Sequence, residues 1–234
     1  MYRRVLLTAL VLMMVAAPLM AAPRPGPWQV SFTLGSFSVR GEEARVEGDV
    51  LLANLGFLDF RIKDLNQAAF GGEWLISIGD WIEAGAGVSY YSGTAPSVYA
   101  DLINADGSEI MQDLKLRIVP ITASVRFLPL TRNAPVQPYV GAGVVFLPWR
   151  YSETGDFVDY EPDPPEIFRA RYVQSGTNAG LVLLGGARVP LGSRYAIGGE
   201  VRYQKAEGKL GTDFYGDKID LGGITYNFTF NVRF

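Results

Sequence analysis

The sequence predicts an all-β chain that folds as an eight-stranded antiparallel up-and-down transmembrane β-barrel. Three observations favour this class: an alternating aromatic C-terminal segment, an N-terminal stretch typical of a secretory signal peptide, and period-2 segments joined by alternately short and long connections. Ten strands are the alternative count, if residues 56–63 form a separate strand. A soluble secreted barrel or sandwich with its apolar face turned inward is the alternative fold.

The first 22 residues predict a signal peptide. Arg3 and Arg4 precede an apolar run over residues 5–15, and a pair of alanines follows at the position of a cleavage site. The run is shorter than the about 20 apolar residues that a membrane-spanning helix needs. We therefore expect a signal peptide over residues 1–22 and one barrel domain over residues 23–234.

Segments of period 2 predict the strands. The eight candidate strands are residues 28–38, a segment that ends at residue 78, and residues 81–91, 113–127, 139–151, 172–189, 195–204 and 220–234. In the fourth strand the apolar residues Leu114, Leu116 and Ile118 occupy even positions, whereas after Pro120 they occupy odd ones. Because proline cannot donate to a ladder, we expect a β-bulge near Pro120.

The connections between these strands alternate in length. Residues 79–80, 128–137 and 190–194 form short connections, whereas residues 39–69, 92–112, 152–171 and 205–219 form longer, more polar ones. Outer-membrane barrels place short turns in the periplasm and long loops outside. We therefore expect both termini on the periplasmic side, and contacts of the wall with outer-membrane lipid and lipopolysaccharide.

The last eleven residues form the most regular strand. Apolar or aromatic side chains fill the even positions from Ile224 to Phe234, and Thr, Asn and Arg fill the odd ones. Successive side chains of a strand point to opposite faces, so one face is aromatic and the other polar. This segment resembles the closing strand of bacterial outer-membrane barrels. That resemblance implies that Phe234 is an insertion signal and that the barrel-assembly machinery is a partner.

The composition excludes several function classes. The chain has no cysteine and no histidine, and its formal net charge is −3, without a basic patch for nucleic acid. Without histidine, the usual general bases and triads of outer-membrane hydrolases cannot be assembled. The segment from Asp101 to Glu109 has acidic residues but not the ligand spacing of an EF-hand. We expect no enzyme, no metal site and no cofactor.

Charged residues on the inward face predict a network inside the barrel. The predicted lumen residues are Glu73, Glu83, Lys115, Arg117, Arg126, Arg150, Arg188, Glu200, Arg202 and Arg233. Acids and bases enclosed together favour structural ion pairs, because an unpaired buried charge is costly. A general acid or base at Glu83 or Glu200 is the alternative interpretation.

An apolar patch is predicted where the fifth and sixth strands meet. Val144, Phe146, Val182 and Leu184 face inward if Tyr139 faces outward. The patch predicts tight apolar packing, or alternatively a groove that admits a small hydrophobic compound.

Two motifs carry a resemblance to a known family. Residues 116–129 read LRIVPITASVRFLP, and residues 137–143 read QPYVGAG. A strand with Pro, Thr and Arg followed by a short turn and a Pro-Tyr-x-Gly-x-Gly strand resembles the OmpA/OmpW-like superfamily of outer-membrane β-barrels. The resemblance implies an integral barrel of the Gram-negative outer membrane, and in its OmpW branch the transport of a hydrophobic ligand. We expect a monomeric barrel with a structural or surface-interaction role. Binding or transport of a small hydrophobic compound is the alternative function.

Overall fold

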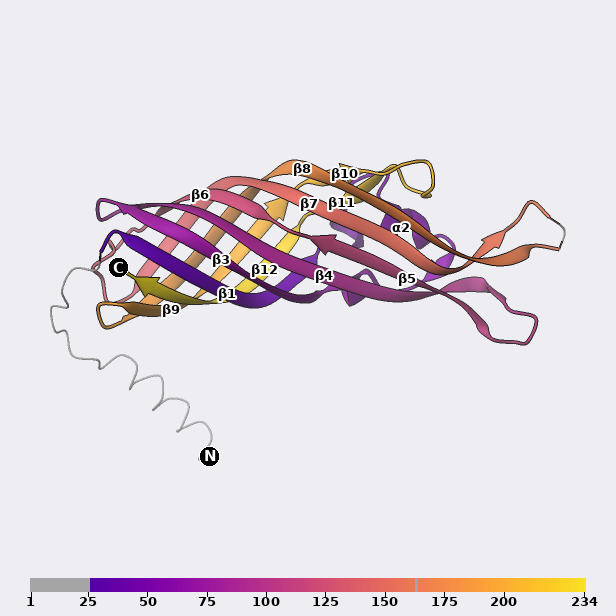
Figure 1. The fold of residues 1–234 in the computed structure, drawn as a ribbon, viewed down its shortest axis with the longest axis horizontal. Coiled ribbons are helices and arrows are strands. Elements are labelled where there is room, and N and C mark those ends of the chain that lie inside the picture. Colours follow the sequence, from indigo (N-terminus) through magenta and orange to yellow (C-terminus); the bar gives the residue numbers. More distant parts are fainter. Residues whose placement is uncertain (1–25, 163) are drawn as a thin grey trace, which may run out of the picture.

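The computed structural model describes residues 26–162 and 164–234, and its main sheet closes on itself. The strands of this sheet are β1 (Trp28–Val39), β2 (Leu58–Asp59), β3 (Gln67–Ile78), β4 (Ile82–Ile103), β5 (Glu109–Ile118), β6 (Ile121–Phe127), β7 (Gln137–Asp159), β8 (Glu166–Leu191), β9 (Tyr195–Lys205) and β12 (Gly223–Arg233). β5 and β6 follow one another along one path, and β2 pairs with the same edge of β4 as β3 does, which leaves eight positions around the ring. Figure 1 shows the resulting elongated barrel.

Every neighbouring pair in the ring is antiparallel, and the first and last strands close it. β1 pairs with β12 from Gln29 opposite Arg233 to Val39 opposite Gly223. The predicted eight-stranded up-and-down barrel is therefore confirmed for the described residues. Residues 56–63 contribute only the two-residue strand β2 and the start of a 3-10 helix, so they do not enlarge the ring. The predicted signal peptide over residues 1–22 lies outside the described residues.

The short turns and both ends of the described chain lie at one end of the barrel (Figure 1). The Trp28 N–H donates to the Phe234 carbonyl at 3.2 Å, and the Phe234 N–H donates to the Trp28 carbonyl at 3.0 Å. Two of the turns use glycines with positive φ, Gly79 at 73° and Gly192 at 75°. Glycine adopts this left-handed conformation without steric cost, which explains its place in these tight reversals.

Two hairpins dominate the opposite end. The predicted loops over residues 92–112 and 152–171 are wrong except at the hairpin tips, because the strands continue through most of both segments. β4 pairs with β5 as far as Ile103 opposite Glu109, and β7 pairs with β8 as far as Asp159 opposite Glu166. Figure 1 shows both hairpins projecting beyond the rest of the barrel. Backbone pairing along these extensions makes them ladders rather than irregular loops.

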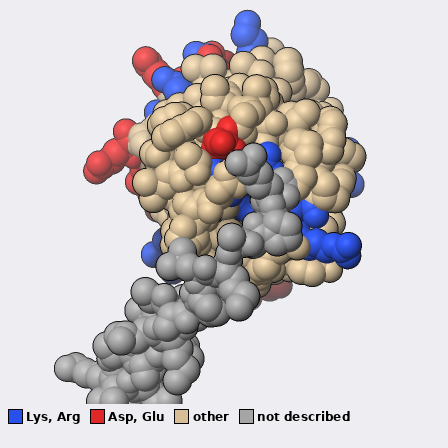
Figure 2. Space-filling model, turned by 90° about the vertical axis from the view of Figure 1, so that its left-hand side faces the viewer, with Lys and Arg blue, Asp and Glu red and all other residues tan. Residues whose placement is uncertain are grey.

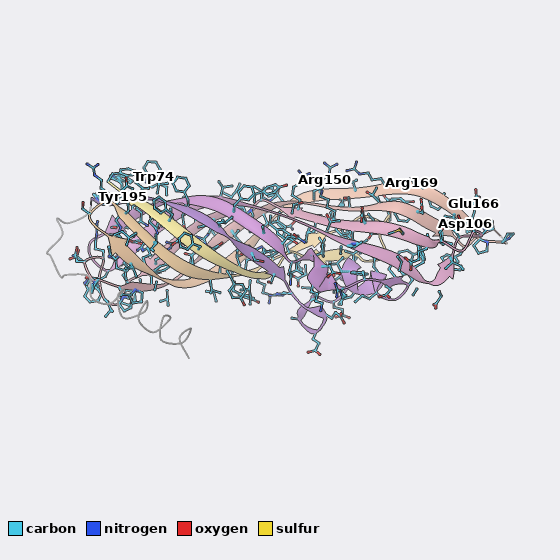
Figure 3. The ribbon with its side chains drawn as sticks, turned by 90° about the horizontal axis from the view of Figure 1, so that it is seen from below. Trp74, Asp106, Arg150, Glu166, Arg169 and Tyr195 are labelled. Carbon is cyan, nitrogen blue, oxygen red and sulfur yellow. The ribbon has the colours of Figure 1, made fainter. Side chains whose placement is uncertain are left out.

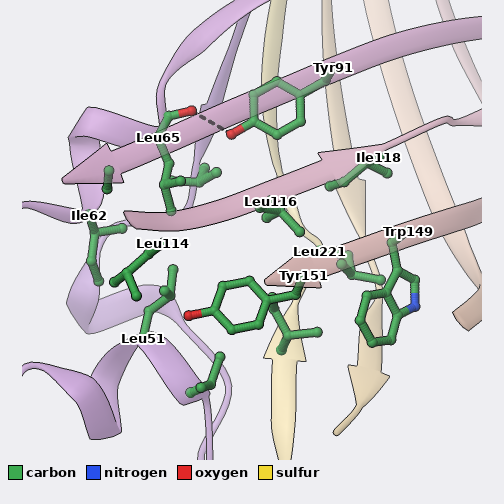
Figure 4. Close-up of a cluster of buried hydrophobic side chains, with 14 of the residues drawn as sticks. Leu51, Ile62, Leu65, Tyr91, Leu114, Leu116, Ile118, Trp149, Tyr151 and Leu221 are labelled. Atoms are coloured by element: carbon green, nitrogen blue, oxygen red, sulfur yellow. Dashed lines mark hydrogen bonds between the residues drawn. The ribbon is translucent and has the colours of Figure 1, made fainter. Parts of the chain in front are cut away.

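Two segments, residues 40–66 and 206–222, fold over the hairpin end of the barrel and are called the cap here. The cap contains η1 (Glu42–Ala44), α2 (Val50–Asn54), β2, η2 (Ile62–Leu65), β10 (Glu207–Lys209) and β11 (Lys218–Asp220). No helix within the described part of the chain is long and apolar enough to cross a membrane. The cap packs onto the inner face of the wall in the main hydrophobic core (Figure 4).

The polarity of the wall inverts partway along the strands. Near the short-turn end the outward side chains are apolar, and Val125 and Val144 are 56% and 45% exposed. Toward the hairpins the outward positions are polar, as at Arg150, whereas inward positions such as Leu116 and Tyr151 are apolar and buried. An apolar exterior suits lipid and a polar one suits water. The outer face of the wall therefore changes from lipid-exposed near the short turns to water-exposed near the hairpins.

The outward apolar side chains of the lower wall form a continuous band, called the lipid belt here. It consists of Trp28, Phe32, Leu34, Phe70, Trp74, Ile78, Ile82, Val88, Ile121, Val125, Phe127, Val140, Val144, Phe146, Leu181, Leu183, Val189, Leu191, Tyr195, Val201, Tyr226, Phe228 and Phe230. Seen from the short-turn end, the surface around the barrel is mostly uncharged (Figure 2). Aromatic residues line its lower edge, where Trp28 packs edge-on against Trp74 at 5.8 Å.

The predicted β-bulge near Pro120 is wrong. β4 pairs Val88 with Ile121 and Tyr91 with Ile118, so two residues separate these positions on each strand and the register is continuous. Even-numbered residues face inward on both sides of Pro120. The apolar residues change parity because the lipid that covers the outer face below this level is replaced by water above it.

Candidate functional site

Four predicted lumen charges meet at the level of the lipid belt and form what is called the charge ring here. Its members are Glu73 on β3, Arg126 on β6, and Glu200 and Arg202 on β9. Arg126 pairs with both carboxylates, reaching Glu200 at 3.0 Å, and Arg202 likewise pairs with both, reaching Glu73 at 2.6 Å. Two acids and two bases thus neutralise one another where water is scarce, which is the condition for a buried ion network to be tolerated.

A second ion pair lies closer to the short turns. Arg188 on β8 donates to Glu83 on β4 at 2.7 Å, and both side chains are buried. Tyr139 separates this pair from the charge ring. Its ring lies 4.9 Å from the Arg126 guanidinium and 5.1 Å from that of Arg188, and its hydroxyl donates to Glu200 at 3.0 Å. One aromatic ring between two guanidinium groups offsets part of their repulsion by cation–π contact.

Arg233 lies at the short-turn end of the lumen and is held by amides. It donates to the side-chain oxygens of Gln29 and Gln137, and Gln29 donates in turn to Asn231 at 2.8 Å. The sequence interpretation missed these three amides. Their signal was available, because each occupies an inward position of a strand whose outward neighbours are apolar.

Three of the predicted lumen charges lie outside the barrel, so their placement is wrong. Lys115 and Arg150 are exposed, and Arg117 is half-buried on the same outward face. Figure 3 shows Arg150 projecting from the wall, away from the barrel axis. The error follows from the change of solvent, since Leu114 and Leu116 fill the inward positions above the lipid belt.

The predicted apolar patch is divided between the two faces of the wall. Val182 and Leu184 face inward and are 3% and 5% exposed. Val144 and Phe146 face outward in the lipid belt, so their predicted inward placement is wrong. Tyr139 faces inward and fixes this parity, because its hydroxyl bonds to the charge ring. The four side chains therefore do not line one groove.

The inner face above the charge ring is filled by the cap. Leu51 and Leu65 of the cap pack against Leu114, Leu116 and Tyr151 of the wall, and all five are fully buried. The Tyr91 hydroxyl also donates to the Leu65 carbonyl, as Figure 4 shows. Burial of large apolar side chains is the main contribution to folding stability in the part of the barrel that is surrounded by water. This core closes the hairpin end of the barrel.

Buried polar groups anchor the cap. Asp49 accepts from the backbone N–H of Leu51 at 2.9 Å, which caps α2, and pairs with Arg45 at 2.7 Å. Asn54 donates to Glu153 on β7 at 2.7 Å, and Tyr151 donates to the same oxygen at 2.9 Å. Burial raises the pKa of the Glu153 carboxyl above its ordinary value, although these two hydrogen bonds oppose the shift.

A small cavity lies between the charge ring and the apolar core. Its lining includes Phe37, Tyr91, Val182, Arg202 and Gln204, and its volume of about 30 Å³ accommodates about two water molecules. Within residues 26–162 and 164–234 no cluster of acidic side chains is arranged to hold a metal ion. The interior is therefore occupied mainly by the protein's own side chains.

Comparisons with known proteins agree with this architecture. A family model described as "Outer membrane protein beta-barrel domain" matches residues 7–234. A search of curated proteins finds no significant match.

Solved structures of outer-membrane proteins are similar to the chain at low identity. OprG from Pseudomonas aeruginosa is 12% identical, with a TM-score of 0.49 over 90% of this chain and 97% of that one. Neisserial surface protein A (NspA) is 14% identical, with a TM-score of 0.48 over 88% and 96%. Ail, the attachment invasion locus protein of Yersinia pestis, is 11% identical, with a TM-score of 0.44 over 89% and 98%. On the family match, the chain belongs to the outer membrane protein beta-barrel domain family and resides in the bacterial outer membrane.

Proposed function

We propose that the protein is a closed, non-enzymatic barrel that acts through its extracellular hairpins in a structural or surface-interaction role. One observation carries the proposal: the Arg233 amide network, the charge ring and the cap core occupy the lumen in succession, with only a small cavity between the last two. Short turns of such barrels lie in the periplasm, so the cap and the two tall hairpins face the outside. With the lumen filled, the exposed extracellular surface is the part available for a partner.

The β7–β8 hairpin carries an aromatic cluster suited to contacts. Phe157 packs against Phe168 at 6.0 Å between ring centroids and against Tyr172 at 4.9 Å. Phe168 is 39% exposed, and Tyr160 near the tip is 55% exposed. Aromatic side chains are enriched at protein interfaces. Because the strands of the hairpin are already paired, little backbone conformational entropy is lost when the hairpin binds a partner. This hairpin is therefore the contact surface that we favour.

Conductance tests the closed lumen. The barrel is inserted into planar lipid bilayers beside a wide porin as positive control, and the current is recorded at fixed voltage. We expect no steady channels, because the charge ring and the cap both obstruct the path. Large, long-lived conductance steps would contradict a closed barrel.

Adhesion tests the hairpin. Bacteria that display the wild-type barrel, a Tyr160→Ser/Phe168→Ser variant or a Tyr215→Ser control are compared for attachment to glycan-coated and protein-coated surfaces. Tyr215 is an exposed aromatic of the cap, outside the hairpin, so it matches the change in surface chemistry on a neighbouring segment. We expect attachment to fall only in the hairpin variant. Equal attachment of all three strains would count against a role for the aromatic cluster.

Passage or capture of a small hydrophobic compound is the second candidate. The observation that favours it is the apolar wall of the interior cavity, formed by Phe37, Tyr91 and Val182. The cavity holds about two waters, so a larger compound requires movement of the side chains that line it. Native mass spectrometry of detergent-purified protein soaked with lipophilic compounds distinguishes the candidates. A stable bound species would favour this function over the closed barrel.

A further inference from the structure

Three basic side chains, Lys115, Arg117 and Arg150, lie together on the outside of the wall and are called the basic cluster here. Arg117 on β5 is the direct register partner of Arg150 on β7, and Lys115 lies two residues from Arg117 on the same face. Side chains directly opposite one another on a sheet have Cβ atoms about 4.5–5.5 Å apart. Like charges at this separation repel each other. The fold by itself therefore gives no reason for their juxtaposition.

The basic cluster has no protein partner among the described residues. None of its three side chains forms an ion pair within 4.0 Å or a side-chain hydrogen bond there. Asp113, two residues from Lys115 on the same face, is exposed and does not pair with it. In register, Ser92 flanks Arg117 and Ser175 flanks Arg150. Across the four neighbouring strands, the two guanidinium groups therefore lie between two hydroxyl groups.

The height of the basic cluster matches the outer edge of the membrane. Below it, residues 119–127 and 140–148 contribute apolar outward positions over about nine residues each, the length of one tilted strand crossing. Arg117 and Arg150 occupy the first outward positions beyond these stretches, on the hairpin side. Figure 3 shows Arg150 on the outer surface between the aromatic end at Trp74 and the hairpin residue Glu166. This is the level of the lipid headgroups.

We propose that the basic cluster binds a phosphorylated headgroup of an outer-leaflet lipid, of the lipid A type found in lipopolysaccharide. Guanidinium groups bind phosphate oxygens in a bidentate manner, and hydroxyl groups complete such a site. An anion between Arg117 and Arg150 removes their mutual repulsion. The site goes beyond the proposed surface role, and it stands whether or not a solute passes the lumen.

A binding experiment with residues 23–234, refolded in detergent, tests the site. Bisphosphorylated lipid A and the same lipid after dephosphorylation are titrated separately, and native mass spectrometry counts the bound lipid. The variants are Arg117→Gln/Arg150→Gln, the charge-preserving Arg117→Lys/Arg150→Lys, and an Arg169→Gln/Arg171→Gln control. The control removes the same charge from β8, higher on the hairpin.

We expect the Gln variant to bind the bisphosphorylated lipid about 30-fold more weakly, at about fivefold for each arginine near a charged lipid surface. The Lys variant binds with an affinity between those of the wild type and the Gln variant, because lysine keeps the charge but lacks the bidentate geometry of arginine. The control binds like the wild type. Dephosphorylation of the lipid reproduces the loss in the wild-type protein. Heat-modifiable migration on gels verifies that each variant is folded.

Three results would overturn the site. The first is equal affinity of wild type and Gln variant for bisphosphorylated lipid A, and the second is an equal loss in the Arg169→Gln/Arg171→Gln control. The third is displacement of the lipid by an equal concentration of inorganic phosphate, which would indicate a site for soluble anions. If the Gln variant does not fold, the comparison of phosphorylated and dephosphorylated lipid on the wild type decides. Equal binding of the two lipids then contradicts the proposal.

Discussion

Asn54 of the cap donates a hydrogen bond of 2.7 Å to Glu153 on β7, and this bond joins two segments that are 99 residues apart. Both side chains are buried, with Asn54 fully so. Asn54→Ala leaves Glu153 with one donor fewer, and we expect it to destabilise the cap by about 1–3 kcal/mol. Hydrogen exchange followed by mass spectrometry should show faster exchange in residues 40–66 and unchanged exchange in the lipid belt. Asn104→Ala, at an exposed hairpin tip, is the matched control. Unchanged protection of the cap would contradict the anchoring role.

Cap stability should depend on pH through Glu153. Burial raises the pKa of its carboxyl in the folded protein, so the folded state binds a proton more readily than the unfolded one. The ionised form costs stability at neutral pH, and this cost disappears as the pH falls through the raised pKa toward the ordinary value of glutamate. Exchange rates of cap amides, corrected for intrinsic chemistry, should therefore fall on mild acidification. Glu153→Gln should remove that dependence, and persistence of the dependence in this variant would assign it to another group.

Removal of one member of the charge ring should destabilise the barrel strongly. Arg126→Ala leaves Glu73 and Glu200 to share Arg202 alone, and breaking a buried network in this way costs about 3–5 kcal/mol. Urea unfolding of the refolded protein in detergent measures the change. Arg169→Ala, on the outside of β8, should lie within about 0.5 kcal/mol of the wild type. Similar effects of the two variants would mean that the ring adds little to stability.

The outward direction of Val144 can be tested with a charge. Val144→Arg places a guanidinium in the lipid belt, where it costs about 2–4 kcal/mol near the bilayer midplane. Thr177→Arg, at the exposed outward position of β8 opposite Pro148 at the upper edge of the belt, should cost only about 0–1 kcal/mol. Unfolding equilibria in lipid vesicles compare the two variants. An inward Val144 would give no such contrast, because an added arginine could then join the lumen network.

Phe234 should act in assembly more than in stability. It is 55% exposed and packs edge-on against Trp74 at 6.0 Å. If the barrel-assembly machinery reads the terminal aromatic, deletion of Phe234 lowers the amount of folded barrel in the outer membrane several-fold. The same deletion should leave refolding in detergent nearly unchanged. Phe230→Ala, on the same face of β12, serves as control, and equal losses in both variants would argue against a terminal signal.

Alternation along the chain was sufficient to predict the barrel and its closure, and it favoured eight strands over the alternative of ten. Trp28 to Leu34 and Ile224 to Phe234 each have one apolar and one polar face, and a strand of period 2 has few other ways to satisfy both. Seven of the predicted lumen charges also lie inside: Glu73, Glu83, Arg126, Arg188, Glu200, Arg202 and Arg233. Inward and outward positions follow the alternation along the lower wall because a single solvent covers its outer face.

The three misplaced charges share one physical cause. An alternation of period 2 distinguishes the two faces of a strand but does not say which one points outward. The face that carries the apolar residues changes from the inner to the outer one between Ile118 and Ile121. Lys115 and Arg150 therefore lie on the face opposite to the predicted one. The cap was missed for a different reason, since Asn54 and Glu153 are brought together only by long-range packing. The apolar even positions from Leu58 to Ile62 were its one visible signal.

The reversal near Pro120 sets different mutational rules for adjacent parts of one strand path. On the outer face, a lysine is the native residue at position 115, whereas at position 125 the same side chain would have to leave hydrocarbon. On the inner face, leucine is native at position 116, whereas at position 126 it would replace an arginine that two glutamates require. The types of side chain that each face tolerates should therefore change within three residues, although the backbone structure is the same on both sides of the boundary.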